Sequence, residues 1–220
     1  MKLFILTLVF LKPVFSQDSF MLNGTENWTS CEEFLNNTTF DHRRVIDVDW
    51  KIFYFWNYEK ENSYHIKFSL ASEMLVDRFR VELEKVDPTI EWSRAVLFME
   101  SSIDVSALYI QTDTPGMYRL IPTLAFQAES VPPNLIFALK LVDPGYLGIV
   151  NCQYRLCYAL APIDKLPDDD KLEAEAKKLG FYGHHNRSYL SQYPRPPLSP
   201  YLEDDSDDDE QVEIDNDMMM

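Results

Sequence analysis

Turn-forming residues interrupt the chain at short intervals between residues 45 and 162, and this punctuation constrains the fold more than any other feature. The runs between the breakers are apolar and aromatic, and they show little helical periodicity. Short strands joined by tight turns are therefore predicted, in an antiparallel meander. The clearest breakers are Asp87-Pro88, Asp113 to Gly116, Val131 to Asn134 and Asp143-Pro144-Gly145.

The interrupted region contains eight candidate strands. Their ranges are Val45 to Trp56, Ser63 to Leu70, Met74 to Lys85, Trp92 to Glu100, Val105 to Thr112, Met117 to Phe126, Leu135 to Val142 and Tyr146 to Leu160. In the third range, Phe79, Val81 and Leu83 share one parity and charged residues share the other. Because successive side chains of a strand point to opposite sides, that alternation predicts one buried and one exposed face. The fold is therefore expected to be all-β.

A helix is predicted after the last strand, from Asp168 to Gly180. Acidic residues open this segment and lysines close it, as the helix dipole favours, and a glycine follows. Leu172, Ala176 and Leu179 lie on one face by their spacing, and we expect this face to dock on the sheet. The acidic triplet at the start is interpreted as a helix N-terminus, so no metal site is expected.

The N-terminal residues predict secretion. Residues 1–16 combine a lysine, a short apolar run and a small residue, which is the pattern of a signal peptide. Asn-x-Ser/Thr sequons begin at Asn23, Asn27, Asn36, Asn37 and Asn186, and the third and fourth overlap. We therefore expect a glycosylated segment at residues 17–30 and an extracellular protein.

The C-terminal residues 194–220 are rich first in proline and then in acid, and they are predicted to be disordered. Ten acidic residues and no base lie between Glu203 and Asp217, so most of the net charge of −16 belongs to this tail. The folded domain, expected at residues 31–193, is only mildly acidic, which argues against nucleic acid as a partner. No later apolar run is long enough to span a membrane.

Three cysteines enter an oxidising compartment, where one disulfide and one free thiol is the simplest outcome. Cys152 and Cys157 are five residues apart, so on one strand their side chains would point to opposite faces. A bridge between these two is therefore disfavoured. The expected disulfide joins Cys31 to either Cys152 or Cys157.

Two segments resemble the sequence motifs of the lipocalins. Cys31, Phe40-Asp41 and Val48-Asp49-Trp50 resemble the opening of that family, where a cysteine, a Phe-Asp pair and a Gly-x-Trp lead into the first strand. Val48 stands at the glycine position. The stretch from Val142 to Cys152 is similar to the second motif, a Thr-Asp-Tyr turn followed by a tyrosine, an apolar strand and a cysteine.

The resemblance implies an eight-stranded antiparallel up-and-down barrel, with one C-terminal α-helix packed outside. Asp143 is retained from the turn triplet, whereas Ala161 and Pro162 stand where the family has an arginine. The chain is most similar to the insect and apolipoprotein-D-like branch, which pairs an N-terminal cysteine with one in the last strands. By this analogy Cys31 pairs with Cys152, and Cys157 is left unpaired or available for a contact with another chain.

A barrel of eight strands encloses enough space for side chains or for one small ligand. The resemblance implies a secreted carrier with a small hydrophobic ligand as its partner, and with Trp50 facing inward at the closed end. By parity Phe53 and Phe55 are expected outside, under the helix. The residues expected to line the cavity are Trp50, Ile52, Tyr54 and Trp56, together with Tyr109 and Tyr118 as polar groups.

Binding is expected rather than catalysis, and no cofactor is expected. The four histidines, at positions 42, 65, 184 and 185, lie in no recognisable nucleophile or metal motif. A second hypothesis is an extracellular structural or interaction protein, in which side chains fill the barrel and the glycans, the free cysteine and the acidic tail carry the function. Hydrophobic ligands would change the tryptophan fluorescence of a carrier but not that of such a scaffold.

Overall fold

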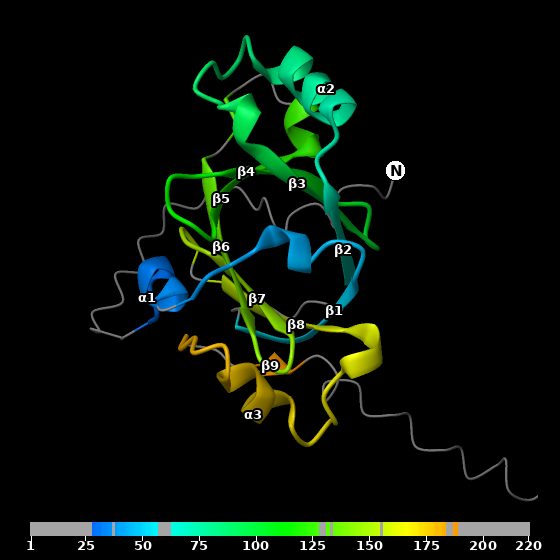
Figure 1. Ribbon diagram of the computed structural model, residues 1–220, viewed down its shortest axis with the longest axis vertical. Helices are drawn as coiled ribbons and strands as arrows, with labels where there is room; N and C mark the ends of the chain where they lie inside the picture. The colour runs from blue at the N-terminus through cyan, green and yellow to red at the C-terminus, as the bar shows by residue number, and fades with distance from the viewer. Residues whose placement is uncertain are drawn as a thin grey trace, which may run out of the picture.

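The computed structural model describes residues 28–36, 38–56, 63–127, 131–132, 134–154, 156–183 and 187–188. The predicted signal peptide and the predicted disordered tail lie outside these residues. Within them, eight antiparallel strands form a closed barrel, with helices packed on its outer surface (Figure 1). No helix in these ranges is both long enough and apolar enough to cross a membrane.

The barrel follows the meander predicted from the turn residues. Each strand pairs with the next from β2 to β8, and β1 closes the ring by pairing with both β8 and β2. A short ninth strand pairs with the second half of β1, beside Tyr54 and Phe55. The strands are β1 (Asp49–Trp56), β2 (His65–Leu70), β3 (Ala95–Ser101), β4 (Ser106–Gln111), β5 (Met117–Pro122), β6 (Leu135–Val142), β7 (Tyr146–Asn151), β8 (Leu156–Pro162) and β9 (Arg187–Ser188).

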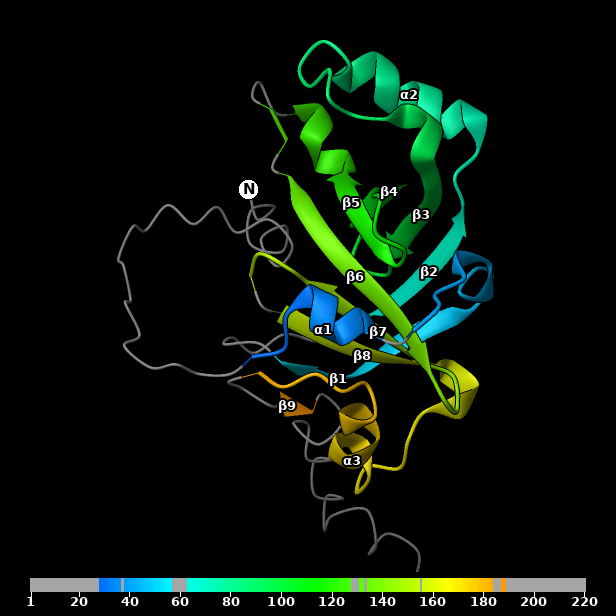
Figure 2. The same ribbon diagram turned by 60° about the vertical axis from the view of Figure 1, so that its left-hand side comes forward.

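Helices cover the barrel at separate places. Figure 2 shows α2 at one end of the molecule, α3 and β9 at the other, and α1 against the side of β6. The helices are α1 (Cys31–Leu35), α2 (Glu73–Leu83) and α3 (Leu172–Lys177), and the 3-10 helices are η1 (His42–Arg44), η2 (Trp92–Arg94), η3 (Thr123–Gln127) and η4 (Ile163–Lys165).

The strand predicted from Met74 to Lys85 is wrong, because this segment forms the helix α2. The side chain of Ser72 caps the helix by accepting a hydrogen bond from the backbone of Leu75. The helix buries Val76, Phe79 and Leu83, whereas Val81 is 76% exposed. Phe79 and Leu83 are four residues apart, so they satisfy the helical spacing as well as the strand alternation.

The prediction of one strand from Tyr146 to Leu160 is also wrong in extent. This segment forms a hairpin of two strands, β7 and β8. The side chain of Asn151 accepts hydrogen bonds from the backbone N–H groups of Gln153 and Tyr154, which makes the turn. One predicted strand is thus a helix and another is two strands, so the barrel still has the eight strands that were predicted.

The predicted C-terminal helix is present as α3, but it is shorter than predicted, because it begins at Leu172 and ends at Lys177. Leu172 and Ala176 on the helix, and Leu179 just beyond it, are buried as expected. The helix packs in a group called here the outer cluster, which lies between the barrel wall and the helices α1 and α3. The buried residues of the outer cluster are Cys31, Phe34, Leu35, Phe53, Tyr54, Trp56, Met117, Ala138, Tyr146, Val150, Cys157, Ala159, Ala161, Leu172, Ala176, Leu179 and Phe181.

The N-terminal segment is held to the barrel by a disulfide and by hydrogen bonds. Cys31 is bonded to Cys152, 121 residues later, which confirms the pairing implied by the resemblance. Thr29 donates its backbone N–H to the carbonyl of Tyr182 and accepts the N–H of Tyr182 on its hydroxyl. The segment before the barrel is therefore joined to the segment after α3 by the two hydrogen bonds between Thr29 and Tyr182, a contact called here the clasp.

Candidate functional site: the barrel interior

The inward-facing side chains of all eight barrel strands form one buried group, called here the inner cluster. Every member is at most 7% exposed. Each side chain is a hydrocarbon, a thioether, a phenol or an indole. The members are Val45, Trp50, Ile52, Phe55, Tyr64, Ile66, Phe68, Leu97, Met99, Val105, Ala107, Tyr109, Tyr118, Leu120, Leu135, Phe137, Leu139, Leu147, Ile149, Tyr158 and Leu160.

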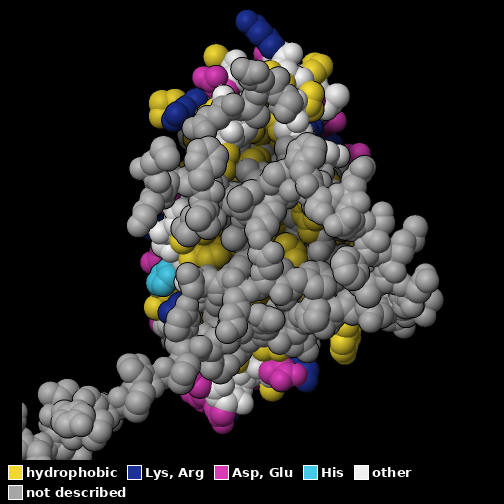
Figure 3. All heavy atoms as spheres, turned by 180° about the vertical axis from the view of Figure 1, so that it is seen from behind, with side chains coloured by type: hydrophobic (Ala, Val, Ile, Leu, Met, Phe, Trp, Pro, Cys, Tyr) yellow, Lys and Arg dark blue, Asp and Glu magenta, His cyan; other side chains and the backbone are white. Residues whose placement is uncertain are grey.

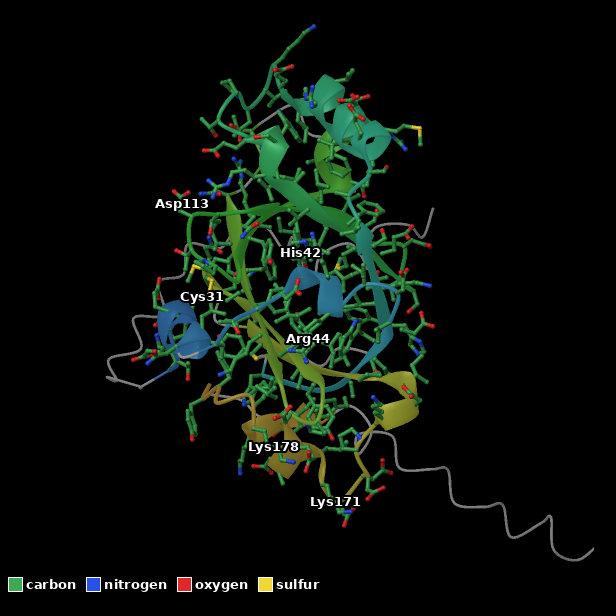
Figure 4. The ribbon with its side chains drawn as sticks, viewed as in Figure 1. Cys31, His42, Arg44, Asp113, Lys171 and Lys178 are labelled. Carbon is green, nitrogen blue, oxygen red and sulfur yellow. A yellow bond between two sulfur atoms is a disulfide. The ribbon has the colours of Figure 1, made fainter. Side chains whose placement is uncertain are left out.

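One end of the barrel is closed by the segment that precedes β1. Trp50 donates its indole N–H to the carbonyl of Val45 at 2.9 Å, and both residues are buried. The ring of Phe40 contacts that of Tyr118 edge-on, with centroids 6.1 Å apart. Figure 4 shows His42 and Arg44, from η1, in front of the ring of strands. This segment therefore covers the barrel end at which β1 starts.

The opposite side of the molecule is seen in Figure 3. Hydrophobic side chains of described residues are visible on this face.

The parity predicted for β1 holds for its first half only. Trp50 and Ile52 face the interior, as predicted. A register shift follows, because Ile52 pairs with Leu160 and Tyr54 with Ala159, so that one extra residue of β1 is inserted. Beyond this bulge, the side chains of β1 point to the side of the barrel wall opposite to the one that the parity predicted.

The predictions for Tyr54, Trp56 and Phe55 are therefore wrong in orientation. Tyr54 and Trp56 belong to the outer cluster, with their ring centroids 4.9 Å apart. Burial, and secondarily the charge of Glu173, raises the pKa of Tyr54 to about 12. Phe55 belongs to the inner cluster and takes the inward position expected for its neighbours. Phe53 lies outside, as predicted.

Tyr109 and Tyr118 lie in the inner cluster, where the prediction placed them. Tyr109 is 0% exposed, and its ring centroid lies 5.7 Å from Phe68, 6.0 Å from Tyr118 and 6.3 Å from Phe137. Burial raises the pKa of the Tyr109 phenol above its usual range. Burial also raises the pKa of Tyr118 to about 12, with a smaller contribution from Asp41. Both phenols therefore stay protonated at neutral pH, and the Tyr109 hydroxyl donates a hydrogen bond.

Sequence reasoning missed several interior residues. Phe68 and Phe137 share a parity with Ile66 and with Leu135, and this alternation was the signal that could have identified them. Nothing in the sequence indicated that Met99 would make a polar contact. It accepts the hydrogen bond of the Tyr109 hydroxyl on its Sδ atom at 3.6 Å, across the β3–β4 pair.

Cys157, predicted to be unpaired or in contact with another chain, is a free cysteine in the outer cluster. Its thiol is fully buried, and burial raises its pKa well above the usual value, with Lys140 acting in the opposite direction. Lys140 donates to the carbonyl of Leu179 at 3.1 Å and lies 5.1 Å from the ring centroid of Phe34. A disulfide with another chain would therefore require the outer cluster to open.

A surface pocket of about 460 Å³ lies beside the disulfide, on the outside of the barrel. Asp113, which lines this pocket, accepts a hydrogen bond from Arg94 at 2.7 Å, and Cys31 lies on the same side of the molecule (Figure 4). The pocket is separate from the inner cluster. Its lining residues are Glu32, Thr112, Asp113, Thr114, Met117, Ile136, Cys152 and Gln153.

Among the predicted glycosylation residues, Asn36 lies in the described part of the chain, exposed at the C-terminal cap of α1. Asn23, Asn27, Asn37 and Asn186 lie outside it. Nowhere in the described ranges do three or more His, Cys, Asp or Glu residues form a group that could hold a metal ion.

The comparisons with known proteins gave no relative. No protein-family model matches the chain, and neither a curated protein nor a solved structure matches it at a significant level. The closed eight-stranded antiparallel barrel is compatible with a lipocalin-like fold.

Proposed function

We propose that this chain is a secreted carrier that binds a small hydrophobic ligand inside the barrel. The observation that carries the proposal is the inner cluster, an apolar and aromatic interior to which every strand of a closed barrel contributes. Barrels of eight strands are wide enough for one small ligand. Ligand sites of this kind combine an apolar lining with a few polar groups that orient the ligand, here the phenols of Tyr109 and Tyr118.

The carrier belongs, in this proposal, to a divergent branch of the lipocalins. Three features support that assignment: the closed barrel, the inward Trp50 at the covered end, and the Cys31–Cys152 disulfide that ties the N-terminal segment to the last hairpin. The insect and apolipoprotein-D-like branch is favoured because its disulfide pattern is similar.

Secretion is part of the proposal. A disulfide is retained in oxidising compartments, and the N-terminal sequence has the pattern of a signal peptide. Asn36 is exposed, so it is accessible to a glycan. Binding is proposed rather than catalysis, and nucleic acid is not proposed as a partner.

Native mass spectrometry tests the proposal on deglycosylated protein purified from its own source without added ligand. A carrier is expected to hold a co-purifying molecule of small mass, which dissociates as the collision energy is raised. Ligand-free protein that also shows no change of tryptophan fluorescence with hydrophobic ligands would contradict the proposal. That pair of results would favour the second hypothesis, a scaffold whose barrel is filled by its own side chains.

A further inference from the structure

The polar contact at Tyr109 is unusual for so deeply buried a phenol. Its hydroxyl donates to the Sδ atom of Met99 at 3.6 Å, and a thioether is a weak acceptor. Buried hydroxyl groups are normally paired with oxygen or nitrogen acceptors. Tyr109 therefore carries a donor that an oxygen atom at the same position would satisfy better.

The surroundings of this contact allow such an exchange. Met99 has a flexible side chain that adopts several shapes at little cost. It pairs across β3 and β4 with Ala107, the one alanine of the inner cluster, and lies beside Phe68 on β2. Ala107 has the smallest side chain of the inner cluster, so the position across from Met99 is the least bulky one towards which the thioether can turn.

We propose that the thioether of Met99 occupies, in the free protein, the position that the polar atom of the ligand takes when it is bound. Tyr109 then donates its hydrogen bond to the ligand and selects neutral molecules that carry one acceptor oxygen on a hydrocarbon body, such as long-chain alcohols and ketones. This inference rests on the proposed function, and it names the ligand class and the residue that selects it.

The charge of the lining supports neutral ligands over ionised ones. Among the described residues no lysine, arginine or histidine is buried, so a carboxylate inside the barrel would lie beside phenols but not beside a buried cation. Burying an unpaired charge in such surroundings is far more costly than burying a hydroxyl or a carbonyl that accepts a hydrogen bond. A fatty acid is therefore a poorer ligand than the alcohol of the same length.

The test uses full-length protein and displacement of the fluorescent probe N-phenylnaphthylamine by dodecanol, dodecane or dodecanoate. We expect the wild type to bind dodecanol about fivefold more tightly than dodecane, the effect of one net hydrogen bond. Tyr109→Phe should abolish this preference by weakening dodecanol alone. Met99→Leu conserves volume but removes the acceptor, so dodecanol affinity should rise about fivefold and dodecane affinity should stay unchanged.

Tyr146→Phe is the matched control, because Tyr146 is a buried tyrosine of the outer cluster and the chemical change is identical. It should leave the affinities of all three compounds unchanged. The inference is overturned if Tyr109→Phe weakens dodecanol and dodecane equally, if Met99→Leu does not strengthen dodecanol, or if dodecanoate binds as tightly as dodecanol. If neither the probe nor any of the compounds binds the folded wild type, the carrier function itself is wrong, and the inference fails with it.

Discussion

Arg119 on β5 donates a hydrogen bond to the carboxylate of Asp87, in the connection between α2 and β3, and both side chains are nearly removed from solvent. Thr89 adds a second anchor, since its backbone N–H and its hydroxyl both donate to the same carboxylate. The pair joins the segment that carries α2 to the wall of the barrel. It is a structural contact outside the inner cluster.

Asp87→Asn should destabilise the protein by about 2–4 kcal/mol, because it leaves the guanidinium of Arg119 largely buried without its carboxylate partner. Urea denaturation followed by tryptophan fluorescence measures the change. Asp113→Asn is the control, since Asp113 also pairs with an arginine but has a side chain that is 96% exposed. Its unfolding curve should lie close to that of the wild type, and a similar loss in both variants would contradict the role given to burial.

The same pair predicts a loss of stability in acid. Burial opposes ionisation of Asp87, but hydrogen bonds from Thr89 and Arg119 outweigh it and hold the pKa of the carboxyl below its usual value. The stabilisation is therefore complete above the unfolded-state pKa of about 3.9 and is lost as the pH falls through the lower folded-state pKa. The difference in unfolding free energy between wild type and Asp87→Asn should shrink below about pH 4. A difference that stays constant down to about pH 2 would show that this carboxylate is not the titrating group.

Cys157 should resist alkylation in the folded protein. Its thiol is fully buried and its raised pKa leaves little thiolate, which is the reactive form. Iodoacetamide should add no label to the native protein and one label per chain once the protein is unfolded without reductant. Mass spectrometry counts the labels, and rapid labelling of the native protein would show that the outer cluster opens readily.

Gly148→Ala should destabilise the protein by about 1–3 kcal/mol, because overpacking displaces neighbouring side chains. An added Cβ atom would lie 2.7 Å from Cζ of Phe34 and 2.9 Å from a methyl carbon of Leu179. Phe34→Leu removes the first of these contacts, so the double variant should lose less stability than the two single variants together. Thermal and urea unfolding provide the values, and strict additivity would mean that the clash is relieved elsewhere.

Turn chemistry made most of the barrel predictable. Asp113 to Gly116 and Asp143-Pro144-Gly145 mark hairpin turns in the sequence, and they connect β4 to β5 and β6 to β7 in the structure. The α2 segment was not predictable in this way, since Phe79 and Leu83 fit two periodicities. The packing of that helix against Phe98 and Phe126, which follow it in the chain, agrees with the helical spacing.

The lining of the interior was predictable only where the strands are regular. Parity assigned Trp50, Ile52, Tyr109 and Tyr118 to the inside, and these residues lie there. It failed for Tyr54 and Trp56 because a bulge depends on how β1 pairs with β8, about 100 residues away, and leaves no local mark in the sequence. The contact of Tyr109 with Met99 likewise depends on the register of β3 and β4.

The clasp between Thr29 and Tyr182, reinforced by the Cys31–Cys152 bond, has a mechanical consequence. When the two ends of the chain are pulled apart, the clasp bears the tension first, because it joins the segment before the barrel to the segment after α3. The strand ladders between residues 49 and 151 lie outside that load path while the covalent bond is intact. Force spectroscopy should therefore record only a short extension from the stretched barrel under oxidising conditions and the full extension after reduction.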